Sequence, residues 1–400
     1  MENYSFTYGE VNKAYEDCVK TKKNTGNAIK FTVSKNEEIV RLCDEINDGS
    51  YEIGSSIAFI VKYPVLREVF AADFRDRIVH HLIMNELMSL FEDEFSDNCF
   101  ACRKGKGVLY GIRTVSEMLN KVTDGYTKDA WIFKMDIKSF FMSINKILLS
   151  EMVDDLIVKK YPENRKKEKL RWLCRKVIMH HPEKNCRIKC DKGLWDKLPI
   201  RKSLFTAKFE RGLPIGNLTS QIFANYYMSF LDKYIINDLG FTYYGRYVDD
   251  FLIMSNNKEE MLSSIPKIVE FAKNHLLLDI HPNKRYCQYY KHGVRFTGGV
   301  IKPGRTYILN RTIESLEYKL SVKFPKYNEK TAGKFMMVVN SYLGYIGNHS
   351  SYRIRKKLLT ENKYIQQWLP YIWVSENYRK IKLLENPFKF KPDEYINLPE

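Results

Sequence analysis

The sequence reads Tyr-Tyr-Gly-Arg-Tyr-Val-Asp-Asp-Phe-Leu-Ile-Met from Tyr243 to Met254. β-branched and aromatic residues flank two adjacent aspartates, Asp249 and Asp250, so the stretch predicts a strand, a tight turn and a second strand. An exposed turn is the simplest interpretation of an Asp pair on its own, because Asp is a common turn residue. Two neighbouring carboxylates also repel each other, and a bound cation would relieve that repulsion.

A third carboxylate occurs upstream in a similar context. A short, mostly apolar strand is predicted from Trp131 to Asp136 and ends on that aspartate. Asp136, Asp249 and Asp250 would then all lie at strand ends. Two-metal phosphoryl transfer requires this arrangement, because two Mg²⁺ ions need hard oxygen ligands from several strands. We therefore expect two Mg²⁺ ions here, for which Mn²⁺ can substitute.

The stretch Tyr247–Asp250, Tyr-Val-Asp-Asp, resembles the Tyr-x-Asp-Asp motif of reverse transcriptases, and Asp136 resembles the aspartate of their first palm motif. The stretch Gly212–Gln221 resembles their second palm motif, and the three motifs occur in the family's order. The resemblance implies an RNA-directed DNA polymerase with an α+β right-hand fold. That fold comprises fingers, a palm of antiparallel sheet plus helices, and a helical thumb.

The resemblance also implies roles for single residues. The metal ligands would be Asp136, the backbone of Ile137, Asp249 and Asp250. Lys284 would lie near the leaving pyrophosphate as a proton donor or countercharge, with His281 as the second choice. The expected nucleotide-binding residues are Lys62, Arg67, Arg103, Ile137, Phe141, Ile215 and Gly216.

Several of these roles have simpler alternatives. A guanidinium such as that of Arg67 suits a triphosphate because it is permanently charged and bidentate, but Arg67 and Lys62 could equally form surface salt bridges. Arg103 lies in a glycine-containing basic loop, which is a weak signal alone. Phe141 would exclude a ribose 2′-hydroxyl, whereas Phe140 is expected to fill the core.

Ile215 distinguishes this chain within the family. Most reverse transcriptases have glutamine at this place, and an apolar side chain cannot make the same hydrogen bond to template or nucleotide. The sequence around it resembles the error-prone enzymes of diversity-generating retroelements, which carry out mutagenic retrohoming. The alternatives are an antiphage, abortive-infection-type reverse transcriptase and a non-catalytic RNA-binding scaffold. A group II intron maturase fits less well, because no DNA-binding or endonuclease extension follows the thumb.

The composition indicates a polyanionic partner. The 400 residues carry a formal net charge of +17 and are 44% hydrophobic, enough for a large core and two or three subdomains. The expected partners are template RNA, cDNA, RNA–DNA duplex and dNTPs. The resemblance adds a small basic oligomeric accessory protein or a structured non-coding RNA. With no signal segment and no membrane-spanning run, we expect a cytoplasmic protein without a membrane partner.

The predicted domains follow the motifs. Residues 1–60 would form an N-terminal extension, 61–130 the fingers, 131–300 the palm with a basic insertion at about 158–210, and 301–400 a basic helical thumb and tail. We predict helices starting near Asp73 and Asn145, strands at Lys62–Pro64 and Arg67–Phe70, and a hairpin over residues 293–300. The eight cysteines follow no disulfide framework, and their spacing does not favour a zinc site.

Overall fold

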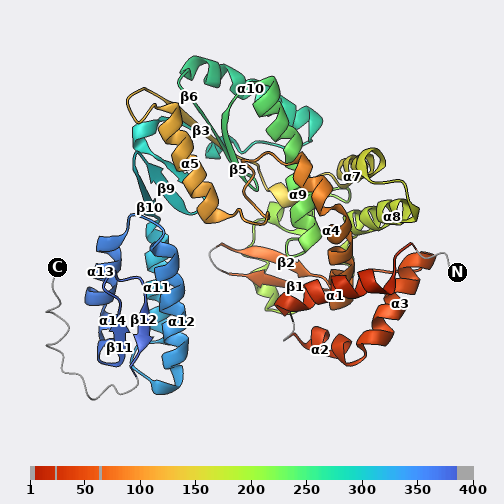
Figure 1. Ribbon diagram of the computed structural model, residues 1–400, viewed down its shortest axis with the longest axis horizontal. Helices are drawn as coiled ribbons and strands as arrows, with labels where there is room; N and C mark the ends of the chain where they lie inside the picture. Colours follow the sequence, from red (N-terminus) through yellow and green to blue (C-terminus); the bar gives the residue numbers. More distant parts are fainter. Residues whose placement is uncertain (1–4, 23–24, 63–64, 385–400) are drawn as a thin grey trace. The chain divides into compact units, whose positions relative to one another are not determined.

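The computed structural model describes residues 5–22, 25–62 and 65–384. The chain divides into two compact units, which are described separately (Figure 1). The first unit contains residues 1–107 and 133–287, and the second contains residues 108–132 and 288–400. The predicted tail beyond residue 384, and Tyr63 and Pro64 of the first predicted strand, lie outside the described residues.

The first unit begins with three helices that lead into a small sheet. The helices are α1 (Tyr8–Lys22), α2 (Gly26–Val33) and α3 (Lys35–Asp48). The sheet has the order β2-β1-β4 and consists of β1 (Ser56–Val61), β2 (Arg67–Ala71) and β4 (Cys186–Ile188). β1 pairs antiparallel with β2 and parallel with β4. The strand predicted at Arg67–Phe70 is therefore confirmed as β2. The basic insertion therefore returns to the fingers region and adds a strand to it.

A four-stranded sheet carries the aspartate motifs. Its order is β5-β6-β3-β7, formed by β3 (Trp131–Asp136), β5 (Tyr243–Tyr247), β6 (Asp250–Ser255) and β7 (Tyr286–Tyr289). β5 and β6 form the predicted antiparallel hairpin, in which Tyr247 pairs with Asp250. The apolar residues around the two aspartates are buried in β6, since Phe251, Leu252 and Ile253 are fully enclosed. Burial on both faces explains why this strand is a continuous apolar run.

The remaining helices of the first unit pack around these sheets. They are α4 (Phe74–Glu94), α6 (Phe140–Ser143), α7 (Lys146–Lys160), α8 (Arg165–Met179), α9 (Leu218–Lys233) and α10 (Lys258–His275). The Asp73 carboxylate caps α4 by accepting from the Arg75 N–H, and the Asn145 side chain caps α7 in the same way, so both predicted helix starts are confirmed. Asn257 caps α10, because its side chain accepts from the Glu260 N–H.

The second unit has its own apolar core. It contains α5 (Val108–Val122), β8 (Val294–Phe296), β9 (Gly299–Lys302), β10 (Arg305–Ile308), α11 (Asn310–Lys323), α12 (Glu329–Ile346), α13 (Tyr352–Glu361), α14 (Lys363–Gln366), β11 (Ile372–Val374) and β12 (Ile381–Leu383). β8 and β9 form the hairpin predicted over residues 293–300. Trp368 is fully buried and stacks on Phe335 with ring centroids 3.9 Å apart, so the predicted helical region is organised around this aromatic pair.

None of the helices within the described ranges is both long and apolar enough to cross a membrane.

Glu68 fastens the basic insertion to β2. Its carboxylate is 1% exposed and accepts hydrogen bonds from Trp195 Nε1 at 2.7 Å, Ser203 Oγ at 2.5 Å and Leu204 N at 2.6 Å. Both carboxylate oxygens are therefore occupied by donors from one segment. A buried anion in a strand is tolerated here because three donors replace the water that it loses.

We expect Glu68→Gln to lower the free energy of unfolding by about 1–3 kcal/mol, because one amide NH₂ group would face a donor and leave buried groups unpaired. Chemical denaturation would measure the change. Glu16→Gln is the control, since its ion pair with Lys35 is on the surface and is worth under about 1 kcal/mol. Equal stabilities of the two variants would contradict this role for Glu68.

Candidate active site

The turn between β5 and β6 holds a β-branched residue in a left-handed conformation. Val248 has φ of 60° and lies between Tyr247 and Asp249. Such a φ is unusual for valine and persists only where the surrounding structure enforces it. Arg246 supplies part of that restraint, because its Nη1 group donates to the Val248 carbonyl at 2.9 Å. The turn that presents the two aspartates is thus strained and held from within.

A buried ion pair anchors the same arginine. Arg246 and Asp232 are each 0% exposed, and two parallel hydrogen bonds of 2.7 Å join the guanidinium to the carboxylate. The arginine also donates to both oxygens of Asn225, and Tyr244 adds a hydroxyl bond to Asp232. Sequence reasoning did not single out this network. The signal was a charged residue inside an otherwise apolar strand, which needs a buried partner.

The three predicted aspartates come from neighbouring strands. The end of β3 reaches the hairpin turn through a hydrogen bond from the Ile137 N–H to the Asp249 carbonyl at 3.3 Å. Two lysines accompany the carboxylates: Lys284 Nζ lies 2.9 Å from Asp136 Oδ1, and Lys134 Nζ lies 2.9 Å from Asp250 Oδ2. Lys134 was not predicted. Its place two residues before Asp136 puts it on the same face of the strand as that aspartate, which was the available signal.

The carboxylates perturb one another. Burial raises the pKa of Asp249 to about 6, and the charges of Asp136 and Asp250 add to the effect. Burial also raises the pKa of Asp250, while Lys134 acts in the opposite direction. Because ionisation of all three groups is unfavourable together, the site favours an added positive charge.

The donor set fits a hard divalent cation. Asp250 Oδ1 is buried and has no hydrogen-bond partner, so a ligand atom is already available. Within the described ranges, no three His, Cys, Asp or Glu side chains are assembled closely enough to hold a metal as they stand. At the aspartates, Lys134 and Lys284 each bind a carboxylate oxygen. Metal binding here would therefore have to displace or reorient lysine contacts.

The predicted second palm motif lies against β2. The Phe70 N–H donates to the Ile215 carbonyl at 2.9 Å, and Gly216 has φ of +122°. A Cβ atom on Gly216 would lie 2.8 Å from Val69 Cγ1 and 3.2 Å from the Phe70 carbonyl oxygen, so glycine is required by both conformation and space.

Phe141 and Ile215 belong to one apolar cluster. Both are half-buried and pack against a core formed by Ala58, Phe70, Met142 and Leu204. Phe140 is 3% exposed, in agreement with its expected core role. The structure thus brings together two of the predicted nucleotide-binding residues and leaves part of each side chain accessible.

The predicted cationic residues differ in their environment. Lys62 and Arg67 are exposed where β1 ends and β2 begins, since Val61 pairs with Arg67. Arg103 is engaged within the protein: its guanidinium is buried and binds Glu92 at 2.6 Å, and it also donates to the carbonyls of Ser96 and Cys99. These contacts stabilise the loop that follows α4, and the nucleotide-binding role of Arg103 stays a prediction.

Comparison with known proteins decides the family. Residues 66–301 match the family described as reverse transcriptase (RNA-dependent DNA polymerase). The chain belongs to this family. The match includes all three aspartates, Lys284 and the second palm motif, so the predicted enzyme class and α+β polymerase fold are confirmed. No protein with a curated function matches the sequence.

Solved structures of yeast telomerases show a distant similarity. Telomerase from Candida albicans, in complex with a fragment of telomeric RNA, has 11% identity and a TM-score of 0.46, with 77% of this chain and 55% of that chain covered. Telomerase from Candida tropicalis has 13% identity and a TM-score of 0.47, with 84% and 62% covered. This reverse transcriptase family member spans 55–62% of these telomerase chains, and the assignment rests on the family match alone.

We expect Arg246→Met to lower the free energy of unfolding by about 3–5 kcal/mol, because Asp232 would keep a buried charge without its cation. Chemical denaturation would measure the loss. The double variant Arg246→Met/Asp232→Leu should recover much of the stability but not the polymerase activity, since the Val248 carbonyl would still lack its donor. Recovery of both would contradict the positioning of the turn by Arg246.

The Asp249 carboxyl should make the metal-free protein less stable as pH rises. Its pKa is raised in the folded protein, so its favourable contribution is complete below the unfolded value near 4 and is lost as pH passes about 6. Between about pH 5 and pH 7 we expect wild type to lose about 1–2 kcal/mol more than Asp249→Asn, measured by denaturation with a chelator present. The Asp76 carboxyl, whose pKa burial also raises to about 6, contributes equally in both proteins. Parallel pH profiles would contradict the prediction.

Proposed function

We propose that this reverse transcriptase copies RNA into DNA by two-metal nucleotidyl transfer at Asp136, Asp249 and Asp250. The family match over residues 66–301, a range that contains all three aspartates, carries the proposal. Asp136, Asp249, Asp250 and the Ile137 carbonyl would hold the two Mg²⁺ ions. When bound, the ions activate the primer 3′-hydroxyl and stabilise charge on the leaving pyrophosphate.

The chain's own residues would divide the remaining work. The 3′-oxygen forms a bond to the α-phosphorus as the bond between that phosphorus and the bridging oxygen to the β-phosphate breaks. Lys284, held beside Asp136, can offset charge on the pyrophosphate or supply a proton to it. Arg67 is exposed and has no carboxylate partner among the described residues, so it is available to bind the triphosphate. Phe141 would lie against the sugar.

Synthesis of cDNA by purified protein, on a primed RNA with Mg²⁺ and four dNTPs, tests this assignment. Asp249→Ala is the matched control, and product that persists in this variant would show that another site or a contaminant makes it. Absence of product from the wild type, both alone and with the RNA encoded next to its own gene, would favour a non-catalytic RNA-binding role.

We further propose that the enzyme is error-prone and serves a diversity-generating retroelement. Ile215 supports this, because it presents a partly accessible apolar side chain, in the cluster that also contains Phe141, where most of the family has a glutamine. An apolar wall can exclude water but cannot hydrogen-bond a base. Where the choice between correct and incorrect nucleotides depends on a positioned polar contact, the free-energy difference between them would fall by about 1–3 kcal/mol.

We expect Ile215→Gln to lower the frequency of misincorporation opposite template adenine by about tenfold, as a regained hydrogen bond of about 1.4 kcal/mol implies. Sequencing of cDNA from both proteins on one defined RNA would measure it. Ile215→Val keeps the apolar wall and is the control. An unchanged error frequency in Ile215→Gln, or accurate wild-type product, would argue against the diversification role and favour a role in defence.

A further inference from the structure

The two lysines beside the aspartates are enclosed to different degrees. Each places its Nζ atom 2.9 Å from one carboxylate oxygen, Lys134 from Oδ2 of Asp250 and Lys284 from Oδ1 of Asp136. The Lys134 side chain is 15% exposed, whereas the Lys284 side chain is 56% exposed. Lys134 belongs to β3, which has β6 on one side and β7 on the other, and Lys284 ends a short 3₁₀ turn outside the sheet.

This difference decides which contact a cation can replace. An exposed ion pair contributes little stability, so Lys284 can exchange Asp136 for water at a small cost in free energy. An enclosed pair is costly to break, because both charges then lose a partner that water does not fully replace. The contact between Lys284 and Asp136 is therefore the replaceable one, and the contact between Lys134 and Asp250 is the permanent one.

The permanent contact divides the two oxygens of Asp250. Oδ2 accepts from Lys134, whereas Oδ1 is buried and has no hydrogen-bond partner within the described part of the chain. A buried polar atom is normally paired, so Oδ1 is the oxygen that awaits a ligand. While Lys134 stays in place, Asp250 offers a metal ion one oxygen and withholds the other.

The number of oxygens that a carboxylate offers distinguishes divalent cations. Mg²⁺ is small and demands near-ideal octahedral geometry, which two closely spaced oxygens of one carboxylate distort. Ca²⁺ is larger, takes more oxygen ligands in a flexible geometry and often binds both oxygens of one carboxylate. A carboxylate restricted to one oxygen therefore suits Mg²⁺ and deprives Ca²⁺ of a ligand.

We propose that Lys134 is a positioning residue that selects Mg²⁺ over Ca²⁺, because it holds Oδ2 of Asp250 and leaves only Oδ1 for a metal ion. The inference rests on the proposed two-metal function and adds the residue that sets the choice of cation. Lys134 acts in two separable ways. Its charge repels every divalent cation to a similar extent, whereas its hydrogen bond changes the ratio of their affinities.

Metal binding without nucleic acid or dNTPs tests this role independently of catalysis. Electron paramagnetic resonance of free Mn²⁺ would measure Mn²⁺ binding, and competition by Mg²⁺ or Ca²⁺ would give the dissociation constant of each. Binding that persists in Asp249→Ala is subtracted as binding elsewhere. We expect Lys134→Met to tighten the binding of both competitors and to lower the ratio of the Ca²⁺ to the Mg²⁺ dissociation constant by about tenfold, as loss of a group that orients a metal ligand implies.

Two controls separate the hydrogen bond from the charge. Lys284→Met removes the same charge from the same group of carboxylates, but its contact gives way to the cation in any case. This variant should bind Mg²⁺ and Ca²⁺ more tightly by similar factors and keep the wild-type ratio. Lys159→Met removes an exposed lysine that pairs with Asp155 on α7, and it should change neither constant. An unchanged ratio in Lys134→Met, or an equal change in Lys284→Met, would overturn the proposal.

A stability measurement covers the case in which Lys134→Met folds poorly. In the presence of a chelator, Lys134→Met should unfold more readily than wild type, and Lys134→Met/Asp250→Asn should recover stability because no charge is left unpaired. When cations are added, Ca²⁺ should raise the melting temperature of Lys134→Met by more, relative to Mg²⁺, than it raises that of wild type. A variant that loses stability but responds to the two cations as wild type does would show a purely structural role and overturn the proposal.

Inhibition of cDNA synthesis links the selectivity to the reaction. With Mg²⁺ present, Ca²⁺ should inhibit Lys134→Met at a concentration about tenfold lower than it inhibits wild type. Wild type that binds Mn²⁺ through Asp249, with a ratio that Lys134→Met does not alter, would overturn only the role of Lys134. Absence of any Asp249-dependent Mn²⁺ binding by wild type would contradict the two-metal function itself, and with it this proposal.

Discussion

Repulsion among three carboxylates is the constraint on which the centre of this reverse transcriptase depends. Asp136, Asp249 and Asp250 come from adjacent strands, and burial together with the charges of the other two carboxylates raises the pKa of Asp249. Lys134 pairs with Asp250 and Lys284 pairs with Asp136, so the two lysines offset part of the negative charge. A site that remains unfavourable for its own charges is suited to divalent cations, because their binding energy includes relief of the repulsion.

The backbone that presents these charges is held by a second electrostatic element. Arg246 and Asp232 are removed from water, and their pairing links β5 to α9 and to the strained turn at Val248. A buried ion pair contributes little net stability compared with apolar residues, but it permits few alternative geometries. It therefore serves to fix one conformation of the turn, which is what a reaction between precisely placed oxygens needs.

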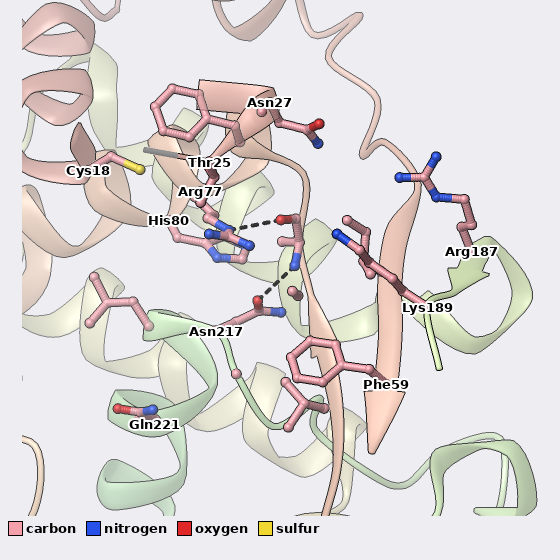
Figure 2. A pocket seen from close by; sticks show the side chains of 18 of the residues that line it. Cys18, Thr25, Asn27, Phe59, Arg77, His80, Arg187, Lys189, Asn217 and Gln221 are labelled. Carbon is pink, nitrogen blue, oxygen red and sulfur yellow. Dashed lines mark hydrogen bonds between the residues drawn. The ribbon is translucent and has the colours of Figure 1, made fainter. Parts of the chain in front are cut away.

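The fingers sheet has two faces with different chemistry. One face carries the apolar cluster that contains Phe141 and Ile215, and the other lines a cavity of about 1070 Å³ whose wall also includes cationic side chains of the basic insertion (Figure 2). Gly216 and Asn217 directly follow Ile215 in the chain. Gly216 touches β2 so closely that no side chain fits. Only the thickness of the sheet separates the two faces. The segment of residues 215–217 connects them, because it hydrogen-bonds to β2 at Phe70 and to Ala72 just after β2.

The sequence alone determined the hairpin with its aspartate pair, the strand ending on Asp136, and the capped helices after Asp73 and Asn145. These are local properties: alternation, capping and φ preferences act within a few residues. Only the tertiary structure decided which distant groups meet. It paired Arg246 with Asp232, Lys134 with Asp250 and Arg103 with Glu92, and it returned Arg187 and Lys189 to a sheet more than a hundred residues away in sequence. Pairing between distant residues depends on the packing of the whole chain, which a local pattern does not specify.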